Sequence, residues 1–182
     1  MHWHATIYAT MLKTQLLLVP PNTKYKDSFL AALLEYQQEN LKDYNKLDYK
    51  WLKDNFSEYV TQKLAEANCE SLPEGYVPHT LLWLVDGTEY IGRVDIRHAL
   101  TDQLRAEGGH IGYDIRPSQR RKGYGKTALM LGLKKAKELG LQEVLVTCDI
   151  GNAPSNKIIQ ANGGTLIDSS TITNKNRYKI PV

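Results

Sequence analysis

Hydrophobic residues along the chain switch between the two-residue period of strands and the 3.6-residue period of helices. Residues 12–19 form a short apolar run that stops at a pair of prolines, which is typical of a strand. Apolar side chains then recur at helical spacing over residues 24–40, and Thr23 is the expected N-cap of that helix. A second helical stretch carries apolar residues at every fourth position over residues 52–64.

The middle of the chain carries a strong hairpin signal. Two strand-like runs, residues 80–85 and 89–96, flank Asp86-Gly87, a dipeptide that favours a tight turn between antiparallel strands. A polar loop over residues 98–108 then leads to a fourth predicted strand at residues 110–115.

Strands and helices continue to alternate to the end of the chain. We predict a helix over residues 126–139 that Gly140 ends, followed by a fifth strand at residues 144–148, so that the connection is a parallel crossover. The remaining predicted elements are one short helix and two strands, at residues 154–162, 165–168 and 177–180. Together these elements predict a fold of the α/β class, with helices packed on a mixed sheet.

Length and composition are those of one globular unit. The chain has 182 residues, of which 42% are apolar and 24% charged, which is enough for one well-buried core and short for two. We therefore predict a single domain over residues 11–182, preceded by a flexible N-terminal segment at residues 1–10. The formal net charge of +3 is modest, and this argues against a nucleic-acid partner.

Other composition signals point to the cytoplasm. Cys69 and Cys148 lie far apart in the sequence without metal-ligand spacing, which fits a reducing compartment. No apolar run approaches the roughly 20 residues that cross a bilayer, so we expect no membrane partner. His2 and His4 are two potential metal ligands, but a solvated terminus explains them better, and we expect no metal.

A strand that turns sharply into a helix marks the predicted functional site. The turn between residues 110–115 and 126–139 presents the free N–H groups and the positive dipole end of the helix, which together favour an anion. Glycines in the turn let a phosphate approach the backbone, and nearby cations add charge, so the predicted ligand carries a diphosphate. The residues concerned are Arg120, Arg121, Lys122, Gly123, Tyr124, Gly125 and Lys126.

The same turn leaves a second interpretation open. Residues 123–127 end in the Gly-Lys-Thr of a nucleotide-triphosphate P-loop, and residues 144–149 are an apolar run that ends in an acid. The P-loop pattern requires a glycine where this chain has Arg120, and such loops usually open the first βαβ unit of a domain. A P-loop NTPase is therefore the weaker alternative.

Residues 120–125 match the pattern Q/R-x-x-G-x-G/A at every fixed position. In this respect the chain resembles the GNAT superfamily of acyl-CoA-dependent N-acyltransferases, and the resemblance covers roughly residues 80–182. Residues 115–125 resemble the fourth strand and pyrophosphate loop of that family, and residues 152–155 resemble the start of its short helix after the fifth strand. Residues 109–113 and 162–164 are similar to a bacterial subgroup of predicted acetyltransferases.

The resemblance implies a fold and a cosubstrate. The fold is a GNAT-like mixed, largely antiparallel central sheet flanked by helices, with splayed fourth and fifth strands. Acetyl-CoA is then the acyl donor, with its pantetheine arm between those strands and its pyrophosphate on the loop at residues 120–126. The further coenzyme contacts implied by the resemblance are Tyr113, Asp114, Ile115, Asn152 and Ser155. Asn152 is equally interpretable as a helix N-cap, because it precedes Ser155 by three residues.

The implied reaction is direct attack by a primary amine on the thioester. A proton acceptor assists this step, and His110 is the first candidate because an ordinary histidine pKa near 6.5 suits proton transfer at neutral pH. Glu107 is the second catalytic candidate, with Asp95 and His98 as alternatives, while a hydrogen-bonded structural histidine remains open for His110. Many members of the family have a tyrosine at the position of Ile159, where it protonates the departing sulfur, and this chain departs from that pattern.

The acceptor and the class of activity stay partly open. A small-molecule or peptide amine is the expected acceptor, and a homodimer is left open. Because the tyrosine is absent and the base is unidentified, a non-catalytic CoA-binding sensor or regulatory domain is the main alternative to an N-acetyltransferase.

Overall fold

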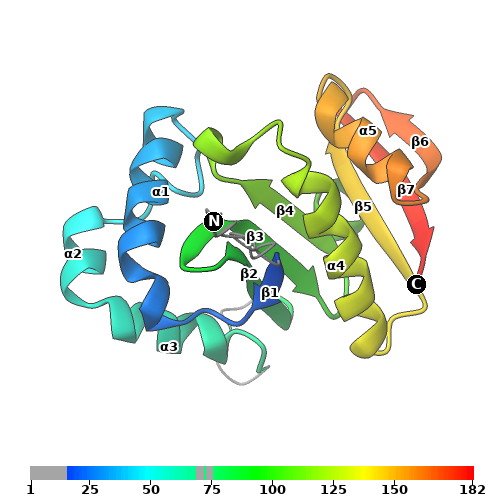
Figure 1. Cartoon of the computed structure of the whole chain (residues 1–182). Coiled ribbons are helices and arrows are strands. Elements are labelled where there is room, and N and C mark those ends of the chain that lie inside the picture. Colours follow the sequence, from blue (N-terminus) through cyan, green and yellow to red (C-terminus); the bar gives the residue numbers. More distant parts are fainter. Residues whose placement is uncertain (1–15, 69–71, 73–75) are drawn as a thin grey trace, which may run out of the picture.

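The larger sheet consists of four antiparallel strands in the order β1-β2-β3-β4 (Figure 1). Its strands are β1 Leu17–Val19, β2 His79–Asp86, β3 Glu89–Arg97 and β4 Ile111–Ile115. This computed structural model describes residues 16–68, 72 and 76–182. The predicted hairpin is confirmed, because β2 pairs with β3 and Gly87 adopts the positive φ, 59°, that the turn requires.

A second sheet contains the last three strands in the order β5-β7-β6, all antiparallel. These are β5 Glu143–Asp149, β6 Thr165–Ser170 and β7 Lys175–Pro181. Among the described residues, β4 and β5 share no ladder, and one isolated bridge joins Gly109 to Val146. The two sheets therefore separate between β4 and β5, and this confirms the predicted fold class with splayed fourth and fifth strands.

Helices cover both faces of the larger sheet. Three of them, α1 Lys26–Gln38, α2 Tyr49–Asp54 and α3 Phe56–Ala65, gather on one side in Figure 1, and α4 Tyr124–Glu138 covers the other face. The remaining helix, α5 Ala153–Ala161, lies beside α4 and packs on β5 of the second sheet. Alternation along β2 explains both layers, since Trp83 and Val85 pack with α1–α3 while Leu82 and Leu84 pack with α4. The α4 core also includes residues from β5 and β7, so one apolar layer underlies both sheets.

Short helical turns complete the chain. They are η1 Thr23–Tyr25, η3 Leu104–Gly108 and η4 Pro117–Gln119. The expected cap at Thr23 is wrong, because Asn22 Oδ1 accepts the Lys24 N–H at 3.0 Å and η1 precedes α1. The predicted helical stretch over residues 52–64 is divided at Asn55 into α2 and α3.

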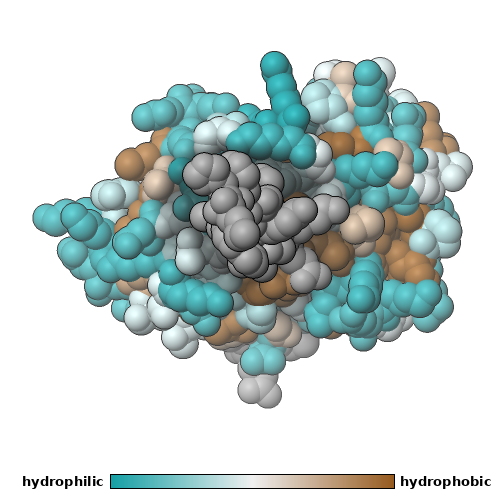
Figure 2. All heavy atoms as spheres, viewed as in Figure 1, coloured by the Kyte–Doolittle hydropathy of each residue, from teal (hydrophilic) through white to brown (hydrophobic). Residues whose placement is uncertain are grey.

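Several sequence predictions concern parts of the chain outside the described residues. These are the flexible segment at residues 1–10, the start of the first strand at residues 12–15, and Cys69. No helix within the described part of the chain is long and apolar enough to span a membrane. In Figure 2 hydrophilic side chains dominate the rim of the view and apolar ones appear in separate patches between them.

Candidate active site

The turn before α4 exposes a run of unpaired backbone amides. Arg121 and Gly123 both adopt left-handed φ values, 63° and 84°, so the chain turns tightly just before α4. Among the described residues, the N–H groups of residues 121–125 have no hydrogen-bond acceptor. A run of free amides at a helix N-terminus is typical of anion-binding sites, and diphosphate binding at this turn stays a prediction.

The two glycines of this turn have different structural roles. Gly123 needs its positive φ, and a Cβ there meets nothing within 4 Å. A Cβ on Gly125 instead lies 2.8 Å from Ile158 Cδ1 of α5. Close packing of α4 on α5 therefore gives Gly125 a structural role, and phosphate access at this position stays a prediction.

The four cations of the turn divide into two tied and two free side chains. Arg120 donates to Ile115 O at 3.0 Å and to Glu39 Oε2 at 2.7 Å, so it anchors the turn to β4 and α1. Lys122 Nζ donates to Gln119 Oε1 at 2.8 Å. Arg121 and Lys126 are exposed and have no polar side-chain partner within the described part of the chain. Arg120 and Lys122 therefore already have partners within the protein, and contact of the four cations with a diphosphate stays a prediction.

One edge of β4 is left without a partner strand. Asp114 lies opposite Arg93 in the ladder with β3, and Arg116 N–H donates to Ile91 O at 2.8 Å in the same ladder. Since hydrogen-bonding direction alternates along an antiparallel strand, the backbone of Tyr113 and the N–H of Ile115 face away from β3. The predicted coenzyme edge therefore includes Tyr113 and Ile115, whereas the backbone of Asp114 is used by β3.

The Asp114 side chain joins β4 to the loop after α1. Its Oδ1 accepts from Tyr36 at 2.9 Å and from Tyr44 at 2.7 Å, and its Oδ2 accepts from Arg93 Nε at 2.7 Å. The two tyrosine rings stack with centroids 3.8 Å apart, and the Arg93 guanidinium lies over the Tyr44 ring. Burial, with Tyr90 and Asp114 nearby, raises the pKa of Tyr36 far above its usual range, so Tyr36 remains a donor. The loop that carries Asp43 is thereby fixed over the sheet.

A cleft of about 320 Å³ opens where β4 and β5 separate. It is lined by Tyr113, Cys148, Asn152 and Ser155, among others. Tyr113 Oη and Ser155 Oγ lie 2.9 Å apart, and burial raises the pKa of Tyr113 to about 12. Asn152 Oδ1 accepts the Ser155 N–H at 3.1 Å, so the N-cap interpretation is confirmed while the residue also faces the cleft.

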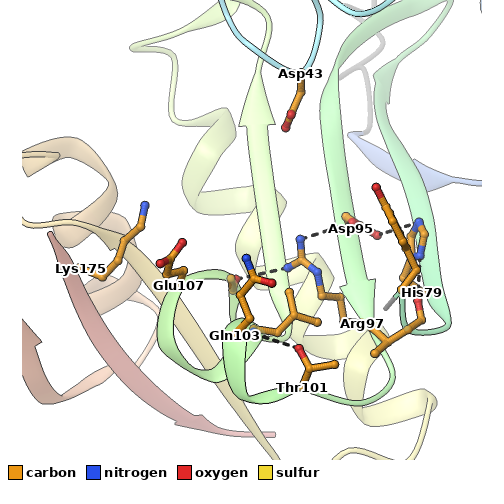
Figure 3. Close-up of a pocket in the computed structure, with 12 residues that line it drawn as sticks. Asp43, His79, Asp95, Arg97, Thr101, Gln103, Glu107 and Lys175 are labelled. Atoms are coloured by element: carbon orange, nitrogen blue, oxygen red, sulfur yellow. Dashed lines mark hydrogen bonds and ion pairs between the residues drawn. The ribbon is translucent and has the colours of Figure 1, made fainter. Parts of the chain in front are cut away.

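A larger cavity of about 640 Å³ adjoins this cleft (Figure 3). The two spaces share four lining residues, Arg97, Glu107, Gly108 and Lys175. Figure 3 shows Asp43 reaching toward the cavity from the opposite side to Glu107 and Lys175. Asp149 Oδ1 lies 2.5 Å from Lys175 Nζ, so that cation is already paired.

The two predicted catalytic residues occupy different positions. Glu107 lines both spaces with an exposed side chain. His110 lines neither, because its Nδ1 accepts the Leu145 N–H at 2.9 Å and its own N–H donates to Leu145 O at 2.7 Å. Burial, then Arg105 and Arg97, lower the pKa of His110. Neutral His110 thus carries its proton on Nε2 and joins β4 to β5, an arrangement that disfavours proton acceptance.

The two alternative bases also differ. His98 Nε2 lies 2.8 Å from Thr80 Oγ1 and its ring is not part of either space, whereas Asp95 lines the larger cavity. Sequence reasoning missed Asp43, His79 and Arg97, which also line it. A signal was present in β3, where Arg93, Asp95 and Arg97 place charges on alternate positions of a strand that is otherwise apolar.

Two further residues bear on the chemistry. Ile159 is fully buried in the core, so no proton donor occupies the position where the family pattern has tyrosine. Cys148 donates its thiol to Asn156 Oδ1 at 3.2 Å, and burial raises its pKa, which disfavours a reactive thiolate. Among the described residues no group of three or more potential metal ligands occurs.

Comparison with known proteins shows the family. The sequence model described as "Acetyltransferase (GNAT) domain" matches residues 15–165. No curated protein sequence matches the chain. Similar solved structures include the microcin C7 self-immunity acetyltransferase MccE, in complex with acetyl-CoA and AMP; the match has 15% identity and a TM-score of 0.63, and it covers 92% of this chain and 93% of that chain.

Two further structures share the fold. RimJ of Mycobacterium smegmatis, in complex with CoA-disulfide, is 16% identical with a TM-score of 0.66, over 91% of this chain and 81% of that chain. RimL, a ribosomal L7/L12 alpha-N-protein acetyltransferase in complex with coenzyme A, is 15% identical with a TM-score of 0.63. The match covers 93% of this chain and 95% of that chain. Because the family match spans most of the sequence and the fold agrees, the chain belongs to the GNAT acetyltransferase family.

Proposed function

We propose that this protein transfers an acetyl group from acetyl-CoA to a primary amine, by direct attack in a ternary complex. The observation that carries the proposal is the alignment of three features along the gap between the sheets. A turn of free amides lies at one end, the β4–β5 cleft follows, and the larger cavity adjoins that cleft. A long thioester and an amine can therefore enter from different sides and meet.

The coenzyme would be held mainly by backbone groups. The amides of residues 121–125 would receive the pyrophosphate, with Arg121 and Lys126 adding charge-assisted contacts. Tyr113 and Ile115 would offer backbone hydrogen bonds to the pantetheine arm, with Asn152 and Ser155 across the cleft. Arg120, Lys122, Gly123, Tyr124 and Gly125 would shape the turn, and Asp114 would hold β4 against α1 and the loop after it.

Positioning would supply most of the rate. Holding amine and thioester in contact can lower the barrier by about 7 to 11 kcal/mol, whereas a proton acceptor contributes roughly 10²- to 10⁴-fold. A thiol of ordinary pKa, about 8.5, leaves as thiolate at a cost of about 2 kcal/mol at pH 7, so the buried Ile159 is tolerable. The acceptor side contains the exposed carboxylate of Glu107, which suits a cationic amine.

The domain that carries the activity, its location in the cell and the class of acceptor belong to the same proposal. We place the activity in one domain, residues 11–182, in the cytoplasm, with a small-molecule or peptide amine as acceptor. RimL, named for a protein N-terminus, is an example of the peptide class among similar folds. A P-loop NTPase fits poorly, because the described strands pair antiparallel and Arg120 occupies the place of the first P-loop glycine.

Two measurements test the proposal. Calorimetry should detect acetyl-CoA binding, and thiol release should follow when a panel of amino acids, polyamines, aminoglycosides and peptides is added. Tight coenzyme binding without release under any amine would favour a non-catalytic sensor. Stabilisation by ATP but not by CoA would favour the NTPase.

A double variant tests whether the turn before α4 binds the diphosphate of the coenzyme. Arg121→Ala with Lys126→Ala should weaken acetyl-CoA binding by about tenfold or more, because charge-assisted hydrogen bonds contribute roughly 1.5–3 kcal/mol each. Lys134→Ala with Lys137→Ala removes two exposed cations further along α4 and serves as the matched control. Equal affinities for both double variants would contradict the assignment.

A further inference from the structure

β3 places a stripe of charged side chains on one face of the larger sheet. Arg93, Asp95 and Arg97 alternate with Val94 and Ile96, which belong to the core on the opposite face. Asp95 and Arg97 line the larger cavity. The strand therefore presents a carboxylate to the space where the amine is proposed to bind.

The Asp95 carboxylate is near two cations without a hydrogen bond to either. Its Oδ1 lies 3.9 Å from His79 Nε2, and its Oδ2 lies 3.9 Å from Arg97 Nη2. Figure 3 shows Asp95 between these two side chains. Both distances exceed hydrogen-bond length. Within the described part of the chain Oδ1 is buried without a hydrogen-bond partner, although a quarter of the side-chain surface remains exposed. A buried carboxylate oxygen in this condition is rare and needs an explanation.

The neighbouring cations are held by other groups. His79 has acceptors at both ring nitrogens, Val77 O at 3.2 Å from Nδ1 and Glu66 Oε2 at 3.1 Å from Nε2. Arg97 Nη1 donates to the carbonyl oxygens of Gly108 and Gly109 at 3.2 and 3.0 Å. Because these contacts fix His79 and Arg97, Oδ2, the carboxylate oxygen that is not fully buried, stays available to a ligand.

Asp95 lies where a ligand at the junction of the cleft and the larger cavity can reach it. Asp95 lies directly opposite Gly112 in the β3–β4 ladder, and Gly112 lines the cleft between the sheets. A Cβ on Gly112 would find its nearest neighbour, Arg97 Nη1, 3.9 Å away, so the space beside this glycine is open. No side chain of β4 therefore stands between Asp95 and the junction of the two spaces.

We propose, on the basis of the proposed acetyl transfer, that Asp95 is the catalytic residue that receives the proton of the attacking amine. The amine nitrogen bonds to the thioester carbonyl carbon, the C–S bond breaks, and its electron pair leaves on sulfur. The proton lost by nitrogen passes to the Asp95 carboxylate and then to water, while the thiolate takes a proton from water. An acceptor that arrives as ammonium releases its first proton to solvent before the attack.

The surroundings of Asp95 suit proton acceptance. Burial raises its pKa, opposed by His79 on β2 and by Arg97 and Arg93 on β3, while Glu66 after α3 adds to the rise. A carboxylate with a raised pKa is a stronger base than an ordinary one. Glu107 lies on the exposed rim and His110 is bound to β5, so Asp95 is the better-placed group.

The test compares Asp95→Asn with Asp102→Asn, which removes an exposed carboxylate of the neighbouring loop outside both spaces. With the best amine of the panel, D95N should lower kcat by about 100-fold or more and leave acetyl-CoA affinity unchanged, whereas D102N should match the wild type. D95N turnover within about threefold of the wild type overturns the inference and leaves the proposed function standing. Absence of wild-type release with every amine overturns both.

Chemical rescue separates proton transfer from positioning. Asp95→Ala should be slow, and added formate should restore turnover while leaving D102N unaffected. The acid limb of the kcat profile should vanish in D95N. Circular dichroism and acetyl-CoA binding report whether each variant folds, and Asp95→Glu, which keeps the carboxylate, should retain much of the rate if D95N does not fold. A folded D95A that formate does not accelerate, or a D95E as slow as D95A, overturns the assignment.

Discussion

A single aspartate shows how an active-site demand can oppose stability. Asp95 has an oxygen that is buried without a hydrogen-bond partner among the residues that the structure describes, and burial disfavours its ionised form. Asp114, on the same face of the sheet, accepts three hydrogen bonds instead. One carboxylate thus braces the fold while the other is left free to act.

The raised pKa of Asp95 gives a testable pH dependence of stability. A carboxyl group whose pKa is higher in the folded state stabilises the fold while protonated, and that contribution is lost as pH rises from about 3.8 through the folded pKa. Asp95→Asn removes this titration. We expect the Tm of D95N relative to the wild type to increase over that pH window and then level off, as followed by thermal denaturation; a difference that does not vary with pH would contradict the burial argument.

At the scale of elements, the contact between α4 and α5 depends on a missing side chain. Gly125→Ala would place a Cβ 2.8 Å from Ile158 Cδ1, the flexible end of that side chain, so Ile158 must shift and we expect a cost near the low end of overpacking, about 1 kcal/mol. Ile158→Val removes the obstructing atom. We therefore expect G125A to lower the free energy of unfolding and the double variant G125A/I158V to recover most of the loss beyond I158V alone, measured by urea denaturation. Additive losses would instead mean that the glycine serves another purpose.

The sequence predicted elements better than contacts between them. Periodicity located the Asp86-Gly87 hairpin, the helix after the glycine turn and the last three strands, because each is set by local residue choice. Periodicity did not predict the break at Asn55, because apolar residues recur at every fourth position through both α2 and α3. The partners of Arg120, Asp114 and His110 lie 81, 78 and 35 positions away in sequence, and no local pattern encodes such contacts.

At the scale of the whole molecule, two sheets share one apolar layer, yet in the described residues the facing edges of β4 and β5 meet only near His110. Residues of β2–β4 belong to the same core as residues of β5 and β7. This shared core fixes the positions of β4 and β5 and keeps the gap between them open. Unpaired edge amides normally exchange with solvent faster than amides of a central strand.

Hydrogen exchange tests this arrangement on the intact protein. Without ligand, the amides of Tyr113 and Ile115 should exchange faster than those of β3, which is paired on both sides. Acetyl-CoA should slow exchange at Tyr113 and Ile115 and at residues 121–125, and leave β3 unchanged. Protection that appears only outside β4 and the turn would place the coenzyme elsewhere.

The alternation within β3 also limits how relatives of this protein can diverge. Inserting or deleting one residue in that strand would send Val94 and Ile96 into the cavity and the charges into the core. New acceptor preferences must therefore arise through point substitutions in β3, or through changes of length in the loops at residues 40–48 and 98–108. Laboratory evolution toward other amines should accordingly diversify those two loops and keep the length of the strand constant.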